Sequence, residues 1–199
     1  MANQQARPRD VSFTPLTPER WDDLVDLFGS ERGASSGCWC MWWRLSSGEF
    51  SSLERAQRRD AFRAIVEQGP PPGILAYDDG KAIGWCAVGP RETLPKLARS
   101  RVSRAAGNAP GVWFVSCFYV RSGCRGDGLM APLLAAAVRF ADEQGAQVIE
   151  ACPIEPKRKL QWGEGFVGVH QVFEGAGFEE VARRSPTRPL MRLVLDGRA

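Results

Sequence analysis

A strongly apolar strand followed by a glycine-rich turn and a helix constrains the fold more than any other feature of this chain. Val112 to Val120 is apolar and aromatic, residues 121–128 follow as Arg-Ser-Gly-Cys-Arg-Gly-Asp-Gly, and apolar residues then recur at helical spacing from Leu129 to Gln144. A helix N-terminus presents unpaired backbone N–H groups and a partial positive charge, and glycines let a phosphate approach them closely. Because Arg121 and Arg125 add positive charge beside the turn, the pattern predicts a pyrophosphate site. A tight turn without a ligand is the alternative.

Two helices are expected before this unit. Thr17-Pro18-Glu19 has the residues of a helix start, and apolar residues follow at helical spacing until Gly29. Ser51 and Glu54 have the spacing of a capping box, which predicts a second helix that ends at Gly69.

The expected strands complete a mixed α/β sheet. Asp79-Gly80 between two apolar runs is typical of a hairpin. The expected strands are a short one beginning at Val11, then Ile74–Tyr77, Ala82–Val88, Val112–Val120, Gln147–Cys152, Glu179–Arg184 and Leu190–Leu195, with short helices within 91–110 and at Val169–Ala176. The order β-α-α-β-β-α-β-α-β-α-β-β predicts an antiparallel hairpin that leads into one parallel pair.

Length and composition favour one ordinary globular domain. The chain has 199 residues, of which 44% are hydrophobic and 25% charged. We expect a flexible arm over residues 1–10 and a single domain over 11–199. The longest apolar run, Leu129–Val138, is about half of what a membrane-spanning helix needs, and the first ten residues do not resemble a signal peptide. We therefore expect a cytoplasmic protein that does not bind a membrane.

Charge and cysteine content argue against a nucleic-acid-binding site and a metal site. The net charge of +3 gives no reason to expect nucleic-acid binding. Without a secretion signal, the six cysteines are expected to be reduced. Cys38 and Cys40 are too closely spaced for a typical zinc site, and His170 is the only histidine, so we expect no metal.

The turn is compatible with more than one phosphate ligand. The chain has no Gly-Lys-Ser/Thr, so it is not a P-loop. Gly126-x-Gly128-x-x-Ala131, with Glu150 about 20 residues on, fits the fingerprint of nicotinamide-dependent oxidoreductases. However, an antiparallel hairpin precedes this unit, and only 49 residues follow Glu150, too few for the remaining parallel strands. The oxidoreductase is therefore the weaker alternative.

Two motifs together resemble the GNAT superfamily of N-acetyltransferases. The first runs from Tyr119 to Met130, and the second, Val172-Phe173-Glu174-Gly175-Ala176-Gly177-Phe178, is similar to the family's Leu-Tyr-Glu-x-x-Gly-Phe. The resemblance covers residues 11–195 in element order. It implies a GNAT-like fold, acetyl-CoA as cosubstrate and a small-molecule or peptide amine as acceptor. A homodimer is compatible with the resemblance, since dimers are common among similar proteins.

The resemblance also implies where acetyl-CoA binds. The pantetheine arm would pair with the main chain of Tyr119 and Val120, where the two central parallel strands splay apart. The phosphates would lie on backbone N–H groups, with Arg121, Arg125 and Phe173 nearby; the backbone groups are those of Gly126, Asp127, Gly128, Leu129, Met130 and Ala131.

The chain departs from the family pattern at three positions. Gly123 stands where the family usually has Gln or Arg, and Met130 stands where a small residue is common. Phe173 replaces the tyrosine that protonates the departing thiolate in many members, and phenylalanine has no proton to donate. This last departure motivates a second hypothesis, a non-catalytic module that binds acyl-CoA.

Three residues are candidates for proton transfer. Glu150, on the strand beside the expected thioester, could accept the amine proton, or it could form an ion pair with a nearby Lys or Arg. His170 lies three residues before Phe173 and could titrate near neutral pH, or it could be structural. Tyr119 could replace the missing acid, or its ring could pack within the fold.

An aromatic loop is the candidate acceptor pocket. Trp39, Trp42, Trp43 and Arg44 could hold an apolar or anionic acceptor, or they could close the core. Cys117 and Cys124 flank the cofactor segments, but no Cys-His-Asp order favours an acyl-cysteine route. The basic stretches Arg91–Arg104 and Lys157-Arg158-Lys159 are expected to be solvated; contact with the 3′-phosphate of CoA or with an acidic substrate is the alternative.

Overall fold

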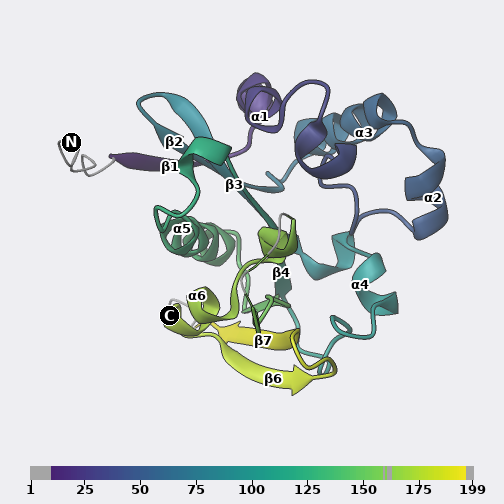
Figure 1. Cartoon of the computed structure of the whole chain (residues 1–199). Coiled ribbons are helices and arrows are strands. Elements are labelled where there is room, and N and C mark those ends of the chain that lie inside the picture. Colours follow the sequence, from purple (N-terminus) through teal and green to yellow (C-terminus); the bar gives the residue numbers. More distant parts are fainter. Residues whose placement is uncertain (1–9, 159, 161–162, 196–199) are drawn as a thin grey trace.

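Seven strands form one mixed sheet in the computed structural model, which describes residues 10–158, 160 and 163–195 (Figure 1). The strand order is β1-β2-β3-β4-β5-β7-β6. Within the described residues, β4 and β5 are the parallel pair and their neighbours are antiparallel. The strands are β1 Val11–Pro15, β2 Gly73–Asp78, β3 Lys81–Pro90, β4 Val112–Val120, β5 Val148–Ala151, β6 Glu179–Arg183 and β7 Pro189–Val194. This arrangement confirms the mixed α/β sheet and excludes the doubly wound sheet of the oxidoreductase alternative.

Six α-helices pack on or around the sheet. They are α1 Trp21–Phe28, α2 Ser47–Ser52, α3 Arg55–Gln68, α4 Lys96–Arg99, α5 Met130–Glu143 and α6 His170–Gly175 within the described part of the chain. None of these helices is long and apolar enough to span a bilayer. The arm expected over residues 1–10 lies outside the described residues, apart from Asp10.

The expected helix start at Ser51 and Glu54 is wrong, because this region forms two helices. Ser46 and Glu49 make the capping box of α2: Glu49 N donates to Ser46 Oγ at 3.2 Å, and Ser46 N donates to Glu49 Oε2 at 2.8 Å. The chain then becomes extended at Leu53, and α3 begins after Glu54. The Ser46–Glu49 pair has the same spacing as the predicted one, so the spacing alone does not locate the helix start.

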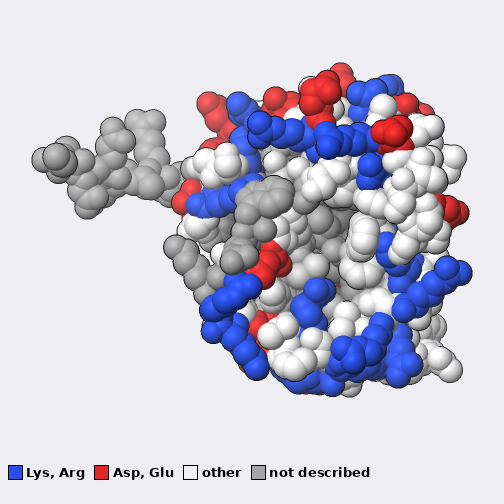
Figure 2. All heavy atoms as spheres, turned by 45° about the vertical axis from the view of Figure 1, so that its right-hand side comes forward, with Lys and Arg blue, Asp and Glu red and all other residues white. Residues whose placement is uncertain are grey.

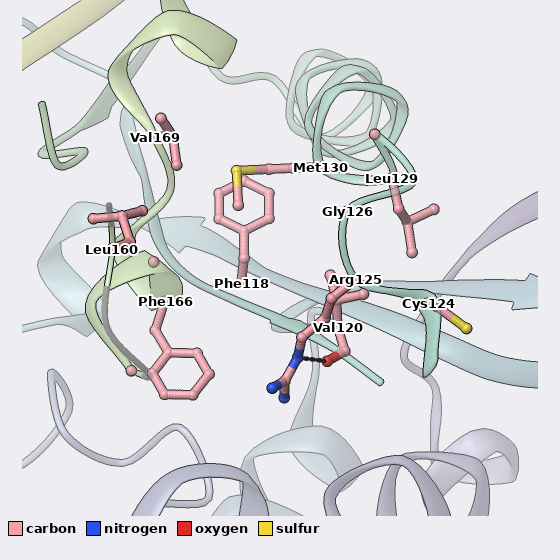
Figure 3. A pocket seen from close by; sticks show the side chains of 13 residues that line it. Phe118, Val120, Cys124, Arg125, Gly126, Leu129, Met130, Leu160, Phe166 and Val169 are labelled. Carbon is pink, nitrogen blue, oxygen red and sulfur yellow. Dashed lines mark hydrogen bonds between the residues drawn. The ribbon is translucent and has the colours of Figure 1, made fainter. Parts of the chain in front are cut away.

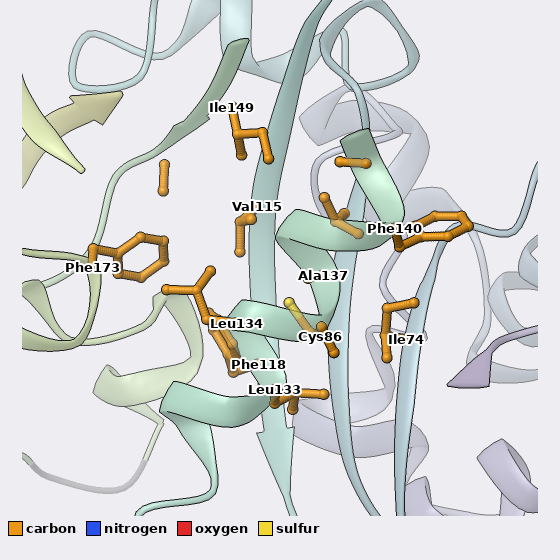
Figure 4. Packing of buried hydrophobic residues seen from close by; sticks show 14 of the residues in the cluster. Ile74, Cys86, Val115, Phe118, Leu133, Leu134, Ala137, Phe140, Ile149 and Phe173 are labelled. Atoms are coloured by element: carbon orange, nitrogen blue, oxygen red, sulfur yellow. The ribbon is translucent and has the colours of Figure 1, made fainter. Parts of the chain in front are cut away.

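Alternation along the strands builds a core on each face of the sheet. Ile74 and Ala76 of β2 belong to the cluster that α5 covers, whereas Leu75 and Tyr77 belong to the cluster under α1 and α3. Figure 4 shows side chains of α5 packed against the strands in the first cluster. Each fully buried Leu or Phe contributes about 1.5–3 kcal/mol to stability.

A bulge in β4 separates two halves of that strand. Ala87 of β3 pairs with Cys117 and Val88 pairs with Val115, so Ser116 is the additional residue. Pairing between β4 and β5 ends at the same point, with Val115 opposite Ala151. The second half of β4 therefore continues beyond the last residue that pairs with β5.

Charged side chains are unevenly distributed over the surface. Lys and Arg dominate the charged side chains of the lower part of the face in Figure 2, whereas acidic and basic side chains are interleaved along its upper edge. The surface between them is hollowed. The small net charge of +3 therefore conceals a local excess of positive charge.

Candidate functional site

A cavity of about 770 Å³ lies beside the second half of β4. One side is formed by the glycine turn and the start of α5, and the other by Leu160 and residues 163–169 (Figure 3). Its wall is largely apolar and consists of Phe118, Val120, Cys124, Arg125, Gly126, Gly128, Leu129, Met130, Leu160, Gly163, Gly165, Phe166 and Val169.

The glycine turn brings backbone to the edge of this cavity. Gly126 and Gly128 have φ angles of +89° and +75°, a left-handed conformation that glycine adopts without strain. A Cβ added at either position would meet no atom within 4 Å, so both residues border open space. Helix α5 begins two residues after Gly128, so its N-terminus lies next to the turn; in its first turn Ala131 N donates to Gly128 O at 3.3 Å, and Pro132 has no N–H. Asp127 and Ala131, also predicted here, are exposed but do not line the cavity.

The two arginines of the turn differ in position. Arg125 lines the cavity, and its Nε donates to Val120 O at 2.8 Å (Figure 3). Arg121 instead donates from Nε to Ala82 O at 3.0 Å and forms a 2.6 Å ion pair with Asp26 of α1. The guanidinium of Arg121 therefore joins β3 and α1 and is not part of the cavity wall.

Tyr119 lies at the border between the cavity and the core under α1. Its ring stacks on Phe166, with the ring centroids 6.1 Å apart. It also meets the ring of Phe28 in an edge-to-face arrangement, with the centroids 5.3 Å apart. Phe166 is itself part of the cavity wall. Tyr119 thus packs within the fold next to the cavity, between the wall residues Phe118 and Val120.

Phe173 is part of the core rather than of the cavity wall. It is completely buried. Its ring packs edge-to-face with Phe118 and with Phe178, at centroid separations of 6.0 Å and 5.1 Å. A Cβ built on Gly168 would lie 2.4 Å from Phe173 Cε2 and 3.1 Å from its Cζ. The end of the ring therefore lies against backbone, behind Phe118.

Glu150 is held by two arginines. Arg91 Nη1 lies 2.6 Å from one carboxylate oxygen, and Arg192 Nη2 lies 2.6 Å from the other. Glu150 is 1% exposed, and it borders a second, smaller cavity together with both arginines. This geometry favours the ion-paired interpretation of Glu150.

His170 is the first residue of α6 and is partly buried. The backbone N–H of His170 donates to Ile154 O at 2.8 Å. Arg183 chiefly, and His170 to a smaller extent, lower the pKa of the Glu180 carboxyl on β6. His170 therefore lies near β6, whereas Phe173 on the same helix points into the core.

The aromatic loop does not gather its side chains into one pocket. Trp39 is 1% exposed and stacks on Trp21 in the core. Trp42 is 45% exposed, with Lys96 Nζ 3.2 Å from its ring centroid. Trp43 packs against a third cluster around Leu94 and Leu97, and burial lowers the pKa of Arg44.

Sequence reasoning missed the wall contributed by Leu160 and residues 163–169. Leu160, Phe166 and Val169 lie at irregular spacing among glycines, without the period of a helix or strand. The short helix at Glu164–Val167 packs beside β4, and Val169 pairs with Ile154, so contacts between segments distant in the sequence bring these residues to the cavity.

Comparisons with known proteins agree with this architecture. A model of the acetyltransferase (GNAT) family matches residues 39–159, more than half of the chain. None of the curated proteins matches the sequence significantly.

Solved structures share the fold at low sequence identity. The paia N-acetyltransferase of Thermoplasma acidophilum, solved with coenzyme A, is 12% identical with a TM-score of 0.52, and the match covers 94% of this chain and 99% of that one. The yncA protein of Salmonella typhimurium, solved with its cofactor acetyl-CoA, is 15% identical with a TM-score of 0.54, covering 95% and 96%. An N-acetyltransferase of Staphylococcus aureus Mu50 is 12% identical with a TM-score of 0.52, covering 93% and 98%. With the family model matching more than half of the sequence, the chain belongs to the acetyltransferase (GNAT) family.

Proposed function

We propose that this protein transfers an acetyl group from acetyl-CoA to an amine, by direct attack of the amine on the bound thioester. Membership of the acetyltransferase (GNAT) family supports acetyl transfer. Solved structures of the same fold that hold coenzyme A or acetyl-CoA support the choice of cosubstrate. The observation that carries the proposal is the separation of β4 from β5 beside a cavity that ends at a glycine turn.

Acetyl-CoA would lie along this cavity with its pyrophosphate at the turn. The left-handed Gly126 and Gly128 leave room for phosphate oxygens close to the backbone, and the N-terminus of α5 favours their negative charge. Arg125 adds a positive charge at the same end. The pantetheine arm would follow the edge of β4 past Val120 and Phe118, where β5 no longer pairs with it.

The thioester would then lie near the bulge at Ser116. A bulge leaves backbone groups outside the regular ladder, and such an N–H can stabilise the developing oxyanion. Direct attack needs a neutral amine held against the carbonyl carbon, so most of the rate enhancement comes from positioning. A water path or His170 would take the amine proton.

We assign protonation of the departing thiolate to Tyr119. It is adjacent in sequence to two residues of the cavity wall and stacks on a third, Phe166. Phe173 cannot donate a proton, and the carboxylate of Glu150 is occupied by two guanidinium groups. The acceptor is an amine whose identity we leave to an activity screen.

A non-catalytic acyl-CoA-binding module is the second candidate. The observation that favours it is the buried phenylalanine at position 173, which deprives the site of a phenolic hydroxyl there. The two candidates predict the same binding but different turnover.

Calorimetric titration followed by an amine screen tests the proposal. We expect acetyl-CoA to bind at micromolar concentrations and NADH, the control dinucleotide, not to bind. Amino acids, aminoglycosides and peptides would then be screened by chromatography for acetylated products. Binding without any product would favour the non-catalytic module, and absence of acetyl-CoA binding would exclude both candidates.

A further inference from the structure

A second cavity, of about 370 Å³, lies on the face of the sheet opposite α5. It is bounded by the segment after β3, by α4 and by the start of β4, and Glu150 of β5 and Arg192 of β7 reach its wall. Among the described residues, none lines both this cavity and the one beside the glycine turn. Its volume lies within the range of small-molecule sites. It is therefore a separate space, which the proposed acetyl transfer does not use.

The buried charges on the wall of this second cavity do not balance. Glu150 is 1% exposed, and its two oxygens bind Arg91 and Arg192, whose side chains are 14% and 19% exposed. Burial lowers the pKa of Arg91, and the charges of Arg192 and Arg184 lower it further, against the attraction of Glu150. Glu92 also lines the cavity, but it is exposed, so water screens its charge. One positive charge is thus left without a buried partner.

Arg192 keeps a hydrogen-bond donor available for a ligand. Its Nε and Nη2 donate to Glu150 Oε1 at 3.2 and 2.6 Å, and Nη2 also donates to Ala106 O at 3.3 Å. Its Nη1 has no hydrogen-bond partner in the described part of the chain and is not a buried atom. The three contacts hold the plane of the guanidinium in place. An oriented guanidinium N–H is a strong donor to a carboxylate.

The wall also offers apolar surface beside these charges. Leu94 and Leu97 are almost completely buried, and Val112 at the start of β4 is partly buried. We propose that this cavity binds a small monocarboxylate with a short aliphatic or aromatic group. Its carboxylate accepts from Arg192 Nη1, and its apolar group packs against Leu94, Leu97 and Val112. A monoanion matches the single unbalanced charge, whereas a dianion would leave an excess of negative charge next to Glu150.

Calorimetric titration of the full chain with a matched pair of probes tests the proposal. The first probe is 4-methylpentanoate, and the second is 4-methylpentanamide, which has nearly the same shape but no charge. We expect the acid to bind at millimolar concentrations. The amide should bind at least about tenfold more weakly, because it loses a hydrogen bond between charged groups. Absence of binding by the acid, or equal binding of the two probes, would overturn the proposal.

Two nearly isosteric substitutions at one position locate the probe. Ala98 lines the cavity from α4 and is exposed, so Ala98→Asp and Ala98→Asn leave the core intact. The added carboxylate of Ala98→Asp should raise the Kd of 4-methylpentanoate about fivefold relative to Ala98→Asn. Ala56→Asp makes the same change of net charge at an exposed position of α3, away from the cavity, and should leave the Kd unchanged. Equal Kd values in the two Ala98 variants would place the acid elsewhere and overturn the proposal.

Competition with acetyl-CoA separates the two cavities. Saturating acetyl-CoA should leave the Kd of 4-methylpentanoate unchanged, because the cavities have separate walls. Displacement of the acid by acetyl-CoA would assign the acid to the first cavity, against the proposal. If the chain does not bind acetyl-CoA, the proposed acetyl transfer fails, but the comparison of Ala98→Asp with Ala98→Asn still decides whether the second cavity binds the acid.

Discussion

Arg91 Nη1 and Glu150 Oε2 lie 2.6 Å apart in an ion pair on the face of the sheet opposite α5. The neighbours of Glu150 on β5, Ile149 and Ala151, face α5, so alternation directs the carboxylate to the other side. Arg91 and Arg192 also donate to the main-chain carbonyls of Ser103 and Ala106. Through these two arginines, the carboxylate of Glu150 helps to hold the segment around Ser103 and Ala106, which precedes β4.

Glu150→Gln should lower the stability of the protein. Removing one charge of a buried ion pair leaves its partners uncompensated, and we expect the free energy of unfolding to fall by about 3 kcal/mol. Urea denaturation measures this change. Glu180→Gln, which breaks an exposed pair with Arg183, is the control and should change it by less than about 1 kcal/mol. Retention of the basic limb of the pH–rate profile in Glu150→Gln would agree with a structural role, whereas its loss would identify Glu150 as the base.

Gly126→Ala should lower the affinity of the protein for acetyl-CoA. The substitution places a methyl group in a left-handed position that borders the cavity, and both the strain and the lost space oppose a bound phosphate. We expect calorimetry to show at least a tenfold increase in Kd. Gly145→Ala is a matched control, because Gly145 is also left-handed with open space around it but follows α5 at its far end. Equal binding by the two variants would argue against the pyrophosphate site.

Phe173→Tyr should destabilise the protein without raising its turnover. The ring end is enclosed by Gly168 and neighbouring aromatic side chains, so the new hydroxyl would be buried without a partner. Such a group lowers stability by about 1–3 kcal/mol. Thermal unfolding and kcat, measured on the same preparation, check this expectation. A clear rise in kcat would mean that the hydroxyl reaches the thioester after all.

Tyr119→Phe should lower kcat and spare acetyl-CoA binding. The variant keeps the stacking on Phe166 and removes only the hydroxyl, and loss of a general acid lowers rates about 10²- to 10⁴-fold. Steady-state kinetics with the best amine from the screen, together with calorimetry, separate the two effects. An unchanged kcat would assign the proton to water.

Tyr77 should ionise only at strongly alkaline pH. Burial and then the 2.6 Å hydrogen bond to Asp23 raise the pKa of this phenol to about 12. Phenolate absorbance at 295 nm reports this pKa in a Tyr119→Phe background, where Tyr77 is the remaining tyrosine. Asp23→Asn should lower the midpoint, and Asp22→Asn should not.

The same shift makes stability depend on alkaline pH. An unfolded chain loses the phenolic proton near pH 10, whereas the folded chain keeps it until about pH 12. The unfolded state therefore binds fewer protons in this interval, and the free energy of unfolding falls as pH rises from about 10 to 12. Denaturation at several pH values checks the sign, and Asp23→Asn should flatten the dependence.

The central unit of the fold was predictable because its signals are local. The apolar run of β4 and the glycines after it identify a strand, a turn and a helix from neighbouring residues alone, and all three are confirmed. The face of the sheet to which Glu150 points was not predictable, since all four residues of β5 are buried and their sequence does not alternate. Its partners, Arg91 and Arg192, come from distant parts of the chain.

In the candidate site, the backbone conformation of the glycine turn was predictable from the sequence, whereas the positions of the side chains were less so. Glycines at 126 and 128 indicate a conformation that the sequence itself requires. The tryptophan loop gave no indication that Trp39 would enter the core while Trp42 remained exposed. Trp39 and Cys40 are left-handed, with φ angles of +44° and +54°, so no regular period orders the side chains of this loop.

Ser116, the additional residue in β4, also changes which residues of the strand point toward α5. Before it, the odd-numbered Trp113 and Val115 face α5; after it, the even-numbered Phe118 and Val120 do. In an uninterrupted strand of the same sequence, Cys117 and Tyr119 would face α5 instead. A single position, next to the point where β4 and β5 cease to pair, thus determines by parity which side chains of β4 border the cavity.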